Sequence, residues 1–267
     1  MDLTEKPRTF PALLIGRAGS RGVPGKNTMV MLGRRMFEYP LIAASRSRFV
    51  DRIYVSSDDD NLHRLSSEYG VRWMQRPAEL ATDTALVEDV VAHAINAIIE
   101  AEVRDPGIVV LLLANAATVS PHIIDEGVAA LVADPTLDSA VTVSSYNEYS
   151  PVRAKRIDEH GLLVPFGDVD AIPGASCDRD TQAQTWFCDG GAWVLRTRCR
   201  ALEGLLPFRW MGRRTYPLRQ EGGLDIDYWP DVARTETWLR HEGFDETQVP
   251  WERQDNHPPT VGEVLRS

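Results

Sequence analysis

Short runs of almost continuous apolar residues alternate along this chain with longer segments in which apolar residues recur at helical spacing. The first four runs lie at residues 12–15, 52–55, 108–113 and 140–143. Strands that are apolar at nearly every position are typical of a parallel sheet covered by helices on both faces. After a long segment of weak periodicity, regular spacing of apolar residues returns at residues 192–195 and 224–227. The alternation therefore predicts a Rossmann-like α/β fold with a mostly parallel sheet.

Helices are predicted between and after these runs, at residues 36–46, 61–69, 84–101, 121–132 and 230–241. The helix at 84–101 has the clearest apolar stripe, which we expect to face the sheet. The stripe consists of Leu86, Val87, Val90, Val91, Ala94, Ile95, Ile98 and Ile99. Asp83 or Thr84 is expected to cap this helix, because short oxygen-bearing side chains accept hydrogen bonds from the first N–H groups.

Residues 146–186 break the alternation and are rich in Pro, Gly and charged residues. A long segment of weak periodicity inside a compact domain is typical of a functional or interface excursion. We therefore expect one domain over residues 1–267, with this segment serving as an interface or acceptor-binding excursion.

Composition favours a small-molecule partner. The 267 residues are 43% hydrophobic, enough to bury a substantial core, and carry a formal net charge of −10. Nucleic acids and anionic membranes need a basic surface, so neither is an expected partner. The longest apolar stretch is far too short to span a membrane, and the first residues lack the apolar core of a signal peptide. A cytoplasmic location is therefore expected.

The cysteines and histidines do not form a recognisable metal or disulfide pattern. Cys177, Cys188 and Cys199 are odd in number and widely spaced, which predicts reduced thiols. The six histidines also lie far apart in the sequence, which argues against a histidine metal centre.

Glycines and cations are concentrated directly after the first predicted strand. Residues 13–27 read LLIGRAGSRGVPGKN, and residues 1–35 carry seven Lys or Arg against two Asp or Glu. A glycine-rich turn after a strand lets backbone N–H groups approach an anion, and nearby cations add the charge that a triphosphate requires. The segment therefore predicts a phosphate-binding loop, with an ordinary solvated turn as the alternative.

The spacing of this loop excludes two common nucleotide motifs. A P-loop requires glycine where Ser20 stands and Ser or Thr where Asn27 stands. The dinucleotide fingerprint GxGxxG is also absent, because Gly16, Gly19 and Gly22 are each separated by two residues.

The loop sequence RAGSRGVPGKN resembles the signature of the CMP-sialic acid synthetases, commonly RxGSKGxPxKN. The segments RIYVSSDDD and QRPAELATDTA resemble that family's second strand and its RPAEL(A/S)DT block, and GLDIDYWPDVARTE at 223–236 resembles its IDID block. The resemblance implies a GT-A-like nucleotidyltransferase fold and a homodimer. It also implies transfer of CMP from CTP to a small acidic acceptor, with release of pyrophosphate.

The same resemblance assigns the nucleotide side of a site. It places Arg17, Arg21 and Lys26 on the CTP phosphates as catalytic cations. The remaining nucleotide-binding candidates are Gly16, Gly19, Ser20, Asn27, Arg76 and Asp83. Alternatively, Arg76 is a surface charge and Asp83 a helix cap.

Two acidic groups are candidates for metal binding. In LDID, Asp225 and Asp227 are two residues apart, so in an extended chain both point to one side and can reach one Mg²⁺. Asp227 is also the candidate group that positions or deprotonates the attacking hydroxyl. The run 58–60 is three further aspartates, which we interpret as a turn and helix start, with an extra metal ligand as the alternative.

The acceptor half departs from the family pattern. Ala114 and Ser120 stand where QPTSPLR has its glutamine and arginine, and CDGGA at 188–192 replaces RPNGA. The candidate acceptor contacts are Asn115, Arg179, Gln182 and Asp189, each with a structural role as the alternative.

The expected acceptor is a sialic-acid-like nonulosonic acid. A phosphonate or other small acid remains an alternative acceptor, and a catalytically silent nucleotide-binding relative is the alternative from another class. The presence of Lys26, Asp225 and Asp227 counts against a silent relative.

Overall fold

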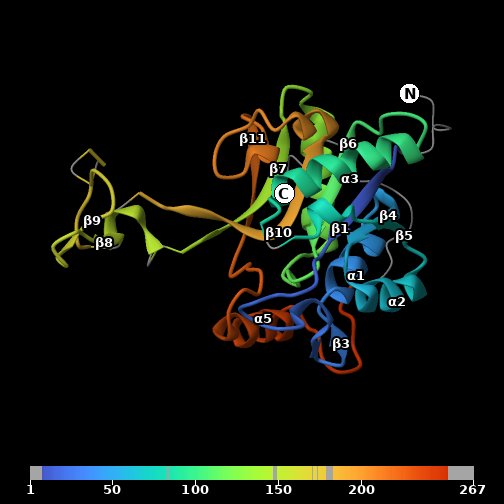
Figure 1. Ribbon diagram of the computed structural model, residues 1–267, viewed down its shortest axis with the longest axis horizontal. Coiled ribbons are helices and arrows are strands. Elements are labelled where there is room, and N and C mark those ends of the chain that lie inside the picture. The colour runs from blue at the N-terminus through green and yellow to red at the C-terminus, as the bar shows by residue number, and fades with distance from the viewer. Residues whose placement is uncertain are drawn as a thin grey trace.

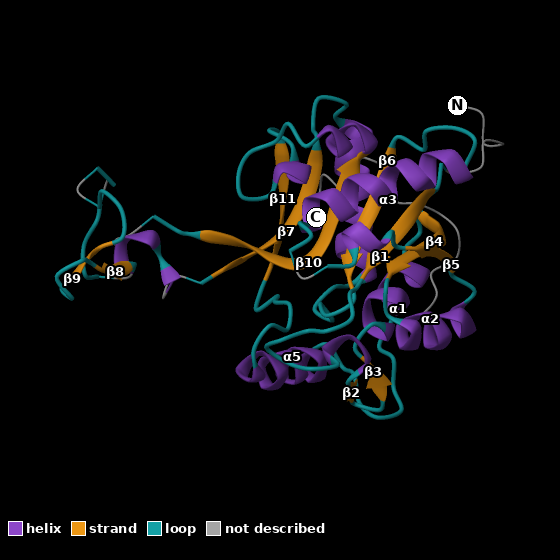
Figure 2. Cartoon of the chain, viewed as in Figure 1, coloured by secondary structure: helices purple, strands orange, loops and turns teal. Residues whose placement is uncertain are grey.

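A twisted seven-stranded sheet lies between helices on both faces, and a long arm projects from one side of it (Figures 1 and 2). The computed structural model describes residues 8–82, 84–146, 149–169, 171–172, 174–178 and 183–251. The sheet order is β11-β7-β10-β6-β1-β4-β5. Its strands are β1 (Phe10–Ile15), β4 (Val50–Ser57), β5 (Arg72–Gln75), β6 (Ile108–Leu113), β7 (Ser139–Ser145), β10 (Trp186–Arg196) and β11 (Thr215–Gln220).

All pairings in this sheet are parallel except those of β10, which runs antiparallel to both β6 and β7. The mostly parallel sheet expected from the apolar runs is thus confirmed. β1 lies between β4 and β6, with Leu13 opposite Tyr54 on one side and Leu111 on the other. Because β1 is covered on both faces, every one of its residues is buried.

Alternate residues of the central strands form two separate cores. Leu14 and Leu112 pack in a core that also contains residues of α1 (Glu38–Arg46), α2 (Asp60–Ser66), α4 (Pro121–Ala133) and α5 (Trp229–His241). Leu13 and Leu111 point to the other face, where the apolar stripe of α3 (Val87–Ala101) covers them. This division follows from the period of two along a strand.

The start of α3 differs from the sequence-based prediction. The helix begins at Val87, its N-cap residue is Leu86, and no side chain caps it, so Thr84 does not have the predicted role. Asp83 lies outside the described residues. Leu86 and Val87 are exposed instead of facing the sheet, because they precede or open the first turn.

Two edge strands were not predicted from the sequence, and the regular pattern at residues 224–227 forms no strand of the sheet. β5 and β11 lie at the sheet edges, and most of their side chains are exposed or half-buried, so neither has an apolar run. Residues 224–227 alternate in burial but join no ladder within the described chain. Leu224 and Ile226 are buried there by loop contacts.

The arm, residues 146–186, leaves the sheet between β7 and β10. These two strands continue outward as a ribbon in which Trp186 pairs with Ser145, and the arm carries the hairpin β8 (Lys155–Ile157) and β9 (Leu163–Pro165) (Figure 1). Ile157, Leu163 and Phe166 on the arm are 73%, 72% and 69% exposed. The arm therefore presents apolar side chains that its own chain does not cover.

No helix among the described residues has the length and apolarity needed to cross a membrane. The three cysteines are free thiols, and burial raises the pKa of Cys188 and of Cys199 to about 11.

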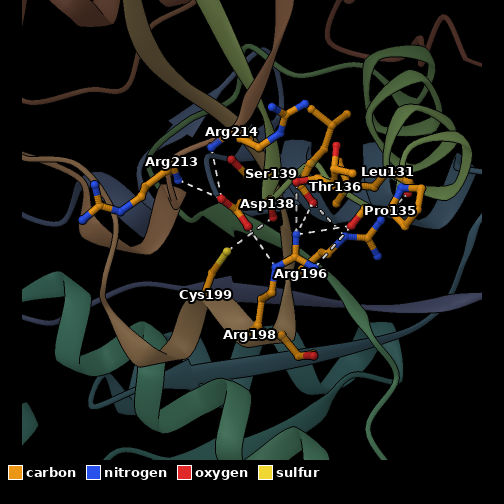
Figure 3. A network of polar contacts seen from close by, with 12 residues as sticks. Leu131, Pro135, Thr136, Asp138, Ser139, Arg196, Arg198, Cys199, Arg213 and Arg214 are labelled. Atoms are coloured by element: carbon orange, nitrogen blue, oxygen red, sulfur yellow. Dashed lines mark hydrogen bonds and ion pairs between the residues drawn. The ribbon is translucent and has the colours of Figure 1, made fainter.

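At the sheet end opposite the phosphate loop, Asp138 joins three chain segments (Figure 3). One carboxylate oxygen accepts hydrogen bonds from the backbone N–H groups of Arg213 and Arg214, at 2.9 and 3.0 Å. The other accepts from Arg198 Nε at 2.8 Å. Burial alone would raise the pKa of Asp138, but these donors outweigh burial and hold the pKa below its ordinary value.

We expect Asp138→Asn to lower the free energy of unfolding by about 1 to 3 kcal/mol at pH 7, because charge-assisted hydrogen bonds are lost. A depressed pKa contributes stability above the unfolded value, about 4, and loses it as the pH falls through the folded value. The difference between wild type and variant in chemical denaturation should therefore shrink below about pH 4. A difference that is constant from pH 7 to pH 3 would contradict this account.

Candidate active site

A pocket of about 440 Å³ opens at the carboxyl ends of β1 and β6. Crevices at this edge of an open α/β sheet are common ligand sites. Four segments contribute to its lining: the phosphate loop (residues 16–27), residues 76–90, residues 113–115 at the end of β6, and the acidic segment (residues 223–227). The structure therefore brings three of the four segments that carry the sequence resemblance to one place.

All three predicted phosphate cations, Arg17, Arg21 and Lys26, line this pocket. Of the other predicted loop residues, Gly16, Ser20 and Asn27 line it too, whereas Gly19 is not among its lining residues. Residues 26–28 form a short 3-10 turn, preceded by Gly25 at φ 69°, a backbone conformation that favours glycine.

Asn27 shapes the phosphate loop from inside. Its side chain is buried, and its amide donates a hydrogen bond to the carbonyl oxygen of Arg17 at 2.9 Å. The backbone N–H of Phe37 donates to the carbonyl oxygen of Asn27 at 3.0 Å. Asn27 therefore holds the two ends of the loop together beside the pocket.

Arg76 is buried, which rules out the alternative that it is a surface charge. Its guanidinium donates to the carbonyl oxygens of Gly16 and Ser56 at 2.8 and 3.1 Å, and lies 3.6 Å from a carboxylate oxygen of Asp58. Burial lowers the pKa of Arg76, Asp58 opposes this effect, and the nearby Arg17 adds to it. Arg76 thus stabilises the ends of β1 and β4 and adds positive charge beside the loop.

The three aspartates at 58–60 form the predicted turn and helix start. Asp59 caps α2 by accepting from the N–H groups of Asn61 and Leu62. Asp58 pairs with Arg76 and accepts from the N–H of Ala18 at 3.2 Å. These contacts support the structural interpretation over that of an extra metal ligand.

Lys26 connects the phosphate loop to the acidic segment. Its ammonium donates to the carbonyl oxygen of Ile226 at 2.5 Å and to a carboxylate oxygen of Asp227 at 2.6 Å. The two backbones also approach closely, because a Cβ on Gly22 would lie 2.0 Å from the carbonyl oxygen of Asp227. Gly22 is therefore required for packing against the acidic segment.

Asp225 and Asp227 lie close enough to repel each other. Burial is the main cause that raises the pKa of Asp225, and the charge of Asp227 raises it further, while Lys26 and the amide of Asn115 act in the opposite direction. Two carboxylates that repel each other beside an open pocket suit a divalent cation, which would neutralise both.

These two residues fit Mg²⁺ as a partial ligand set. Among the described residues, no three His, Cys, Asp or Glu side chains gather as a metal site. Mg²⁺ is commonly held by one or two carboxylates together with substrate phosphates and water. Asp225 and Asp227 would therefore share the ion with the triphosphate.

The predicted acceptor contacts have other roles or lie outside the described chain. Asn115 lines the pocket, but its amide donates to Asp225 at 3.1 Å and to the carbonyl oxygen of Ile226 at 3.0 Å. Asp189 is only 4% exposed and does not line the pocket. This corrects its predicted role, because a buried carboxylate with protein partners cannot face an acceptor. Arg179 and Gln182 lie outside the described residues.

Ala114 and Ser120, two of the positions that depart from the family pattern, have structural roles. Ala114 is fully buried, and a Cβ on Gly16 would lie 2.8 Å from the Ala114 Cβ. Ser120 caps α4 by accepting from the N–H of Ile123. Neither side chain lines the pocket.

The structure adds lining residues that the sequence reasoning missed. Thr82 and Tyr228 supply hydroxyl groups, and Leu80, Val87 and Val90 supply an apolar wall. Tyr228 directly follows LDID, and Leu80 and Thr82 lie inside the RPAEL block. Their position within or next to the recognised motifs is the sequence feature that could have identified Leu80, Thr82 and Tyr228 as pocket residues.

A larger hollow of about 1210 Å³ lies between α4, α5 and the end of β11. It shares no lining residue with the pocket, and its charged residues have mixed sign, among them Arg219, Arg234, Glu221 and Glu242. The concentration of cations and paired carboxylates identifies the smaller pocket as the candidate active site.

We expect Asp225→Asn to raise the unfolding temperature of the metal-free protein at pH 8, because burial and the charge of Asp227 both disfavour the ionised carboxylate. An acid whose folded pKa is raised destabilises the fold when ionised, and this cost disappears as the pH falls through the folded value. The advantage of the variant should therefore shrink toward pH 4. Thermal unfolding across pH measures it, and a variant that is less stable at pH 8 would contradict it.

Comparison with known proteins agrees with this geometry. N-acylneuraminate cytidylyltransferase from Oncorhynchus mykiss is 23% identical over 248 residues, covering 91% of this chain and 54% of that protein. CMP-N,N'-diacetyllegionaminic acid synthase from Legionella pneumophila is 31% identical over 157 residues, covering 57% of this chain and 65% of that protein. The matches thus span less than two thirds of the length of either relative.

Among solved structures, CMP:2-keto-3-deoxy-manno-octonic acid synthetase complexed with CTP shares the fold, with a TM-score of 0.64 and 15% identity. That match covers 88% of this chain and 99% of the other. A model of the cytidylyltransferase family matches residues 12–156, which is more than half of the chain and includes the phosphate loop. This chain therefore belongs to the cytidylyltransferase family.

Proposed function

We propose that this protein transfers CMP from CTP to a hydroxyl group of a small acidic acceptor and releases pyrophosphate. The observation that carries the proposal is the contact of Lys26 with Asp227, which joins the phosphate loop to the paired carboxylates beside one pocket. Such a pocket offers cations for a triphosphate and carboxylates for a metal ion, the two requirements of nucleotidyl transfer.

In the proposed reaction, the acceptor oxygen attacks the α-phosphorus of CTP. The new oxygen–phosphorus bond forms as the bond to the bridging oxygen breaks, and pyrophosphate leaves with that electron pair. Arg17, Arg21 and Lys26 stabilise the charge that develops on the phosphates. Lys26 exchanges its contact with Asp227 for a phosphate oxygen, and the Asp227 carboxylate then accepts the proton of the acceptor hydroxyl.

Mg²⁺ is the proposed cofactor, held by Asp225 and Asp227. When bound, it supplies Lewis-acid charge stabilisation and alignment of the phosphates. The chain's own contribution is to orient the two carboxylates, through Asn115 and the backbone contacts of the acidic segment.

For the acceptor we propose a sialic-acid-like nonulosonic acid. The names of the relatives support this class, because they include N-acylneuraminate cytidylyltransferases and a CMP-N,N'-diacetyllegionaminic acid synthase. The substituted positions Ala114, Ser120 and Cys188 make the choice within the class a question for substrate assays.

We expect magnesium-dependent release of pyrophosphate with CTP and a nonulosonic acid, and far less with ATP, GTP or UTP. Pyrophosphate release should be measured with nonulosonic acids, eight-carbon ulosonic acids, phosphonates and neutral sugar 1-phosphates. Lys26→Ala should lower kcat/KM at least about 100-fold, because a group that stabilises transition-state charge is lost. The exposed Arg64→Ala is the matched control and should change kcat/KM less than about twofold, as for other surface substitutions.

Turnover with phosphonates alone would replace the nonulosonic acid by a phosphonate. Turnover confined to neutral sugar 1-phosphates, or equal use of purine nucleotides, would refute the proposed reaction. CTP binding without pyrophosphate release from any acceptor in the panel would favour a silent nucleotide-binding relative.

We also propose a homodimer in which the arm packs against a second copy. The support is the exposed apolar surface of Ile157, Leu163 and Phe166 on a projection that extends from the body of the protein. A loop folded on its own domain would bury these side chains.

Sedimentation at micromolar concentration should therefore show a dimer, and the double variant Leu163→Ser/Phe166→Ser should shift it toward monomer by at least about tenfold in Kd, because buried apolar area is lost. Val132→Ser, on the exposed side of α4, is the matched control and should remain dimeric. A monomeric wild type would contradict the proposal.

A further inference from the structure

Asp189 is the centre of a buried polar network beneath the acidic segment. One of its carboxylate oxygens accepts hydrogen bonds from Ser144 Oγ at 2.7 Å and from Gln220 Nε2 at 2.9 Å. The other accepts from the backbone N–H of Gly191 at 3.1 Å. Burying a carboxylate is costly unless hydrogen bonds replace its water, so three converging donors on one buried side chain indicate a built arrangement.

The partners of Asp189 also hold the backbone of the acidic segment. Ser144 Oγ accepts from the N–H of Gly223 at 3.0 Å. Gln220 Nε2 donates to the carbonyl oxygen of Thr118 at 3.0 Å. Thr118 Oγ1 in turn donates to the carbonyl oxygen of Leu224 and accepts from its N–H, both at 2.8 Å. The two residues that precede Asp225 are therefore fixed through one connected network.

Glycines allow the close approach of β10 to this segment. Gly190 has φ +80°, and a Cβ there would lie 3.0 Å from the Cβ of Asp225 and 3.3 Å from its Oδ1. On the other side, a Cβ on Gly223 would lie 2.5 Å from Oδ2 of Asp189. The ladder between β10 and β7 shifts register between Cys188 and Trp193, which is where the pair of glycines lies. The backbone of residues 188–192 therefore fits closely against that of residues 222–227.

On the far side of Asp225 the segment is fixed independently. The N–H of Ile226 donates to the carbonyl oxygen of Asn115 at 3.0 Å, and the amide of Asn115 donates to Asp225 and Ile226. Asp225 therefore lies between two anchors, one from the Asp189 network and one from Asn115. Its carboxylate is directed toward the pocket before any ligand binds.

We infer that Asp189 is a positioning residue that holds the acidic segment, through Ser144, Gln220 and Thr118, so that Asp225 is oriented for the metal ion. The effect of Asp189 on catalysis depends on the proposed function. The positioning of the acidic segment by Asp189 is a property of the metal-free protein and does not depend on that function. A carboxylate suits this place because it only accepts hydrogen bonds and all three groups around it donate. An asparagine at this position would place its NH₂ group against at least one of these donors, where no hydrogen bond can form.

Asp189→Asn should therefore loosen the acidic segment while leaving the nucleotide pocket in place. We expect the backbone N–H groups of Gly223 and Leu224 to exchange with solvent at least tenfold faster in the metal-free variant, measured by hydrogen exchange. The apparent affinity for Mg²⁺ in pyrophosphate release should fall about 10- to 100-fold, the usual range when a group that orients metal ligands is lost. CTP affinity measured without Mg²⁺ should stay within about twofold, because the phosphate loop is unchanged.

Asp105→Asn, an exposed carboxylate on the loop before β6, is the matched control and should change none of these quantities. Ser144→Ala removes one donor and one acceptor with little change of volume, and should reproduce a smaller part of the effect if Asp189→Asn does not fold. Unchanged exchange at Gly223 and Leu224 in either folded variant would overturn the inference.

The two levels of the proposal fail in different ways. Absence of pyrophosphate release in the wild type would refute the proposed function, whereas faster exchange in the variant would still establish the positioning role. Conversely, an active wild type with unchanged hydrogen exchange in the variants would refute the positioning role of Asp189 and leave the proposed function standing.

Discussion

The candidate site depends on the contact between the phosphate loop and the acidic segment, which lie about 200 residues apart in the chain. Lys26 spans this contact with one ammonium group, bonded both to a carbonyl oxygen and to Asp227. The backbones meet where Gly22 leaves no room for a side chain. A pocket with cations on one wall and carboxylates on the other exists only because these two segments close against each other.

Arg76 and Asp225, which carry opposite charges beside this pocket, are each held in place by protein partners. Arg76 is committed to carbonyl oxygens at the ends of β1 and β4 and to Asp58. Asp225 is held by Asn115 on one side. Because Arg76 and Asp225 have these partners, both signs of charge are fixed beside one pocket, which is the preorganisation that charge stabilisation in phosphoryl-type transfer requires.

The acceptor side is organised differently from the nucleotide side. In the described chain, the pocket-lining cations all belong to the phosphate loop or to Arg76. Asp189, at a position where the family pattern RPNGA has proline, turns inward and supports the acidic segment. The CDGGA sequence therefore contributes to the shape and the positioning of the acidic segment.

The sequence alone determined the four early strands, the helices that cover them, the phosphate loop and the pair Asp225 and Asp227. These features depend on local periodicity, on the placement of glycines or on a short motif. They can therefore be recognised without knowing which distant residues they contact. Only the tertiary structure decided the edge strands β5 and β11, whose half-exposed side chains leave no apolar run. It also decided that Asp189 is buried and that Asn115 faces the acidic segment, because hydrogen-bond partners more than 30 residues away leave no local pattern.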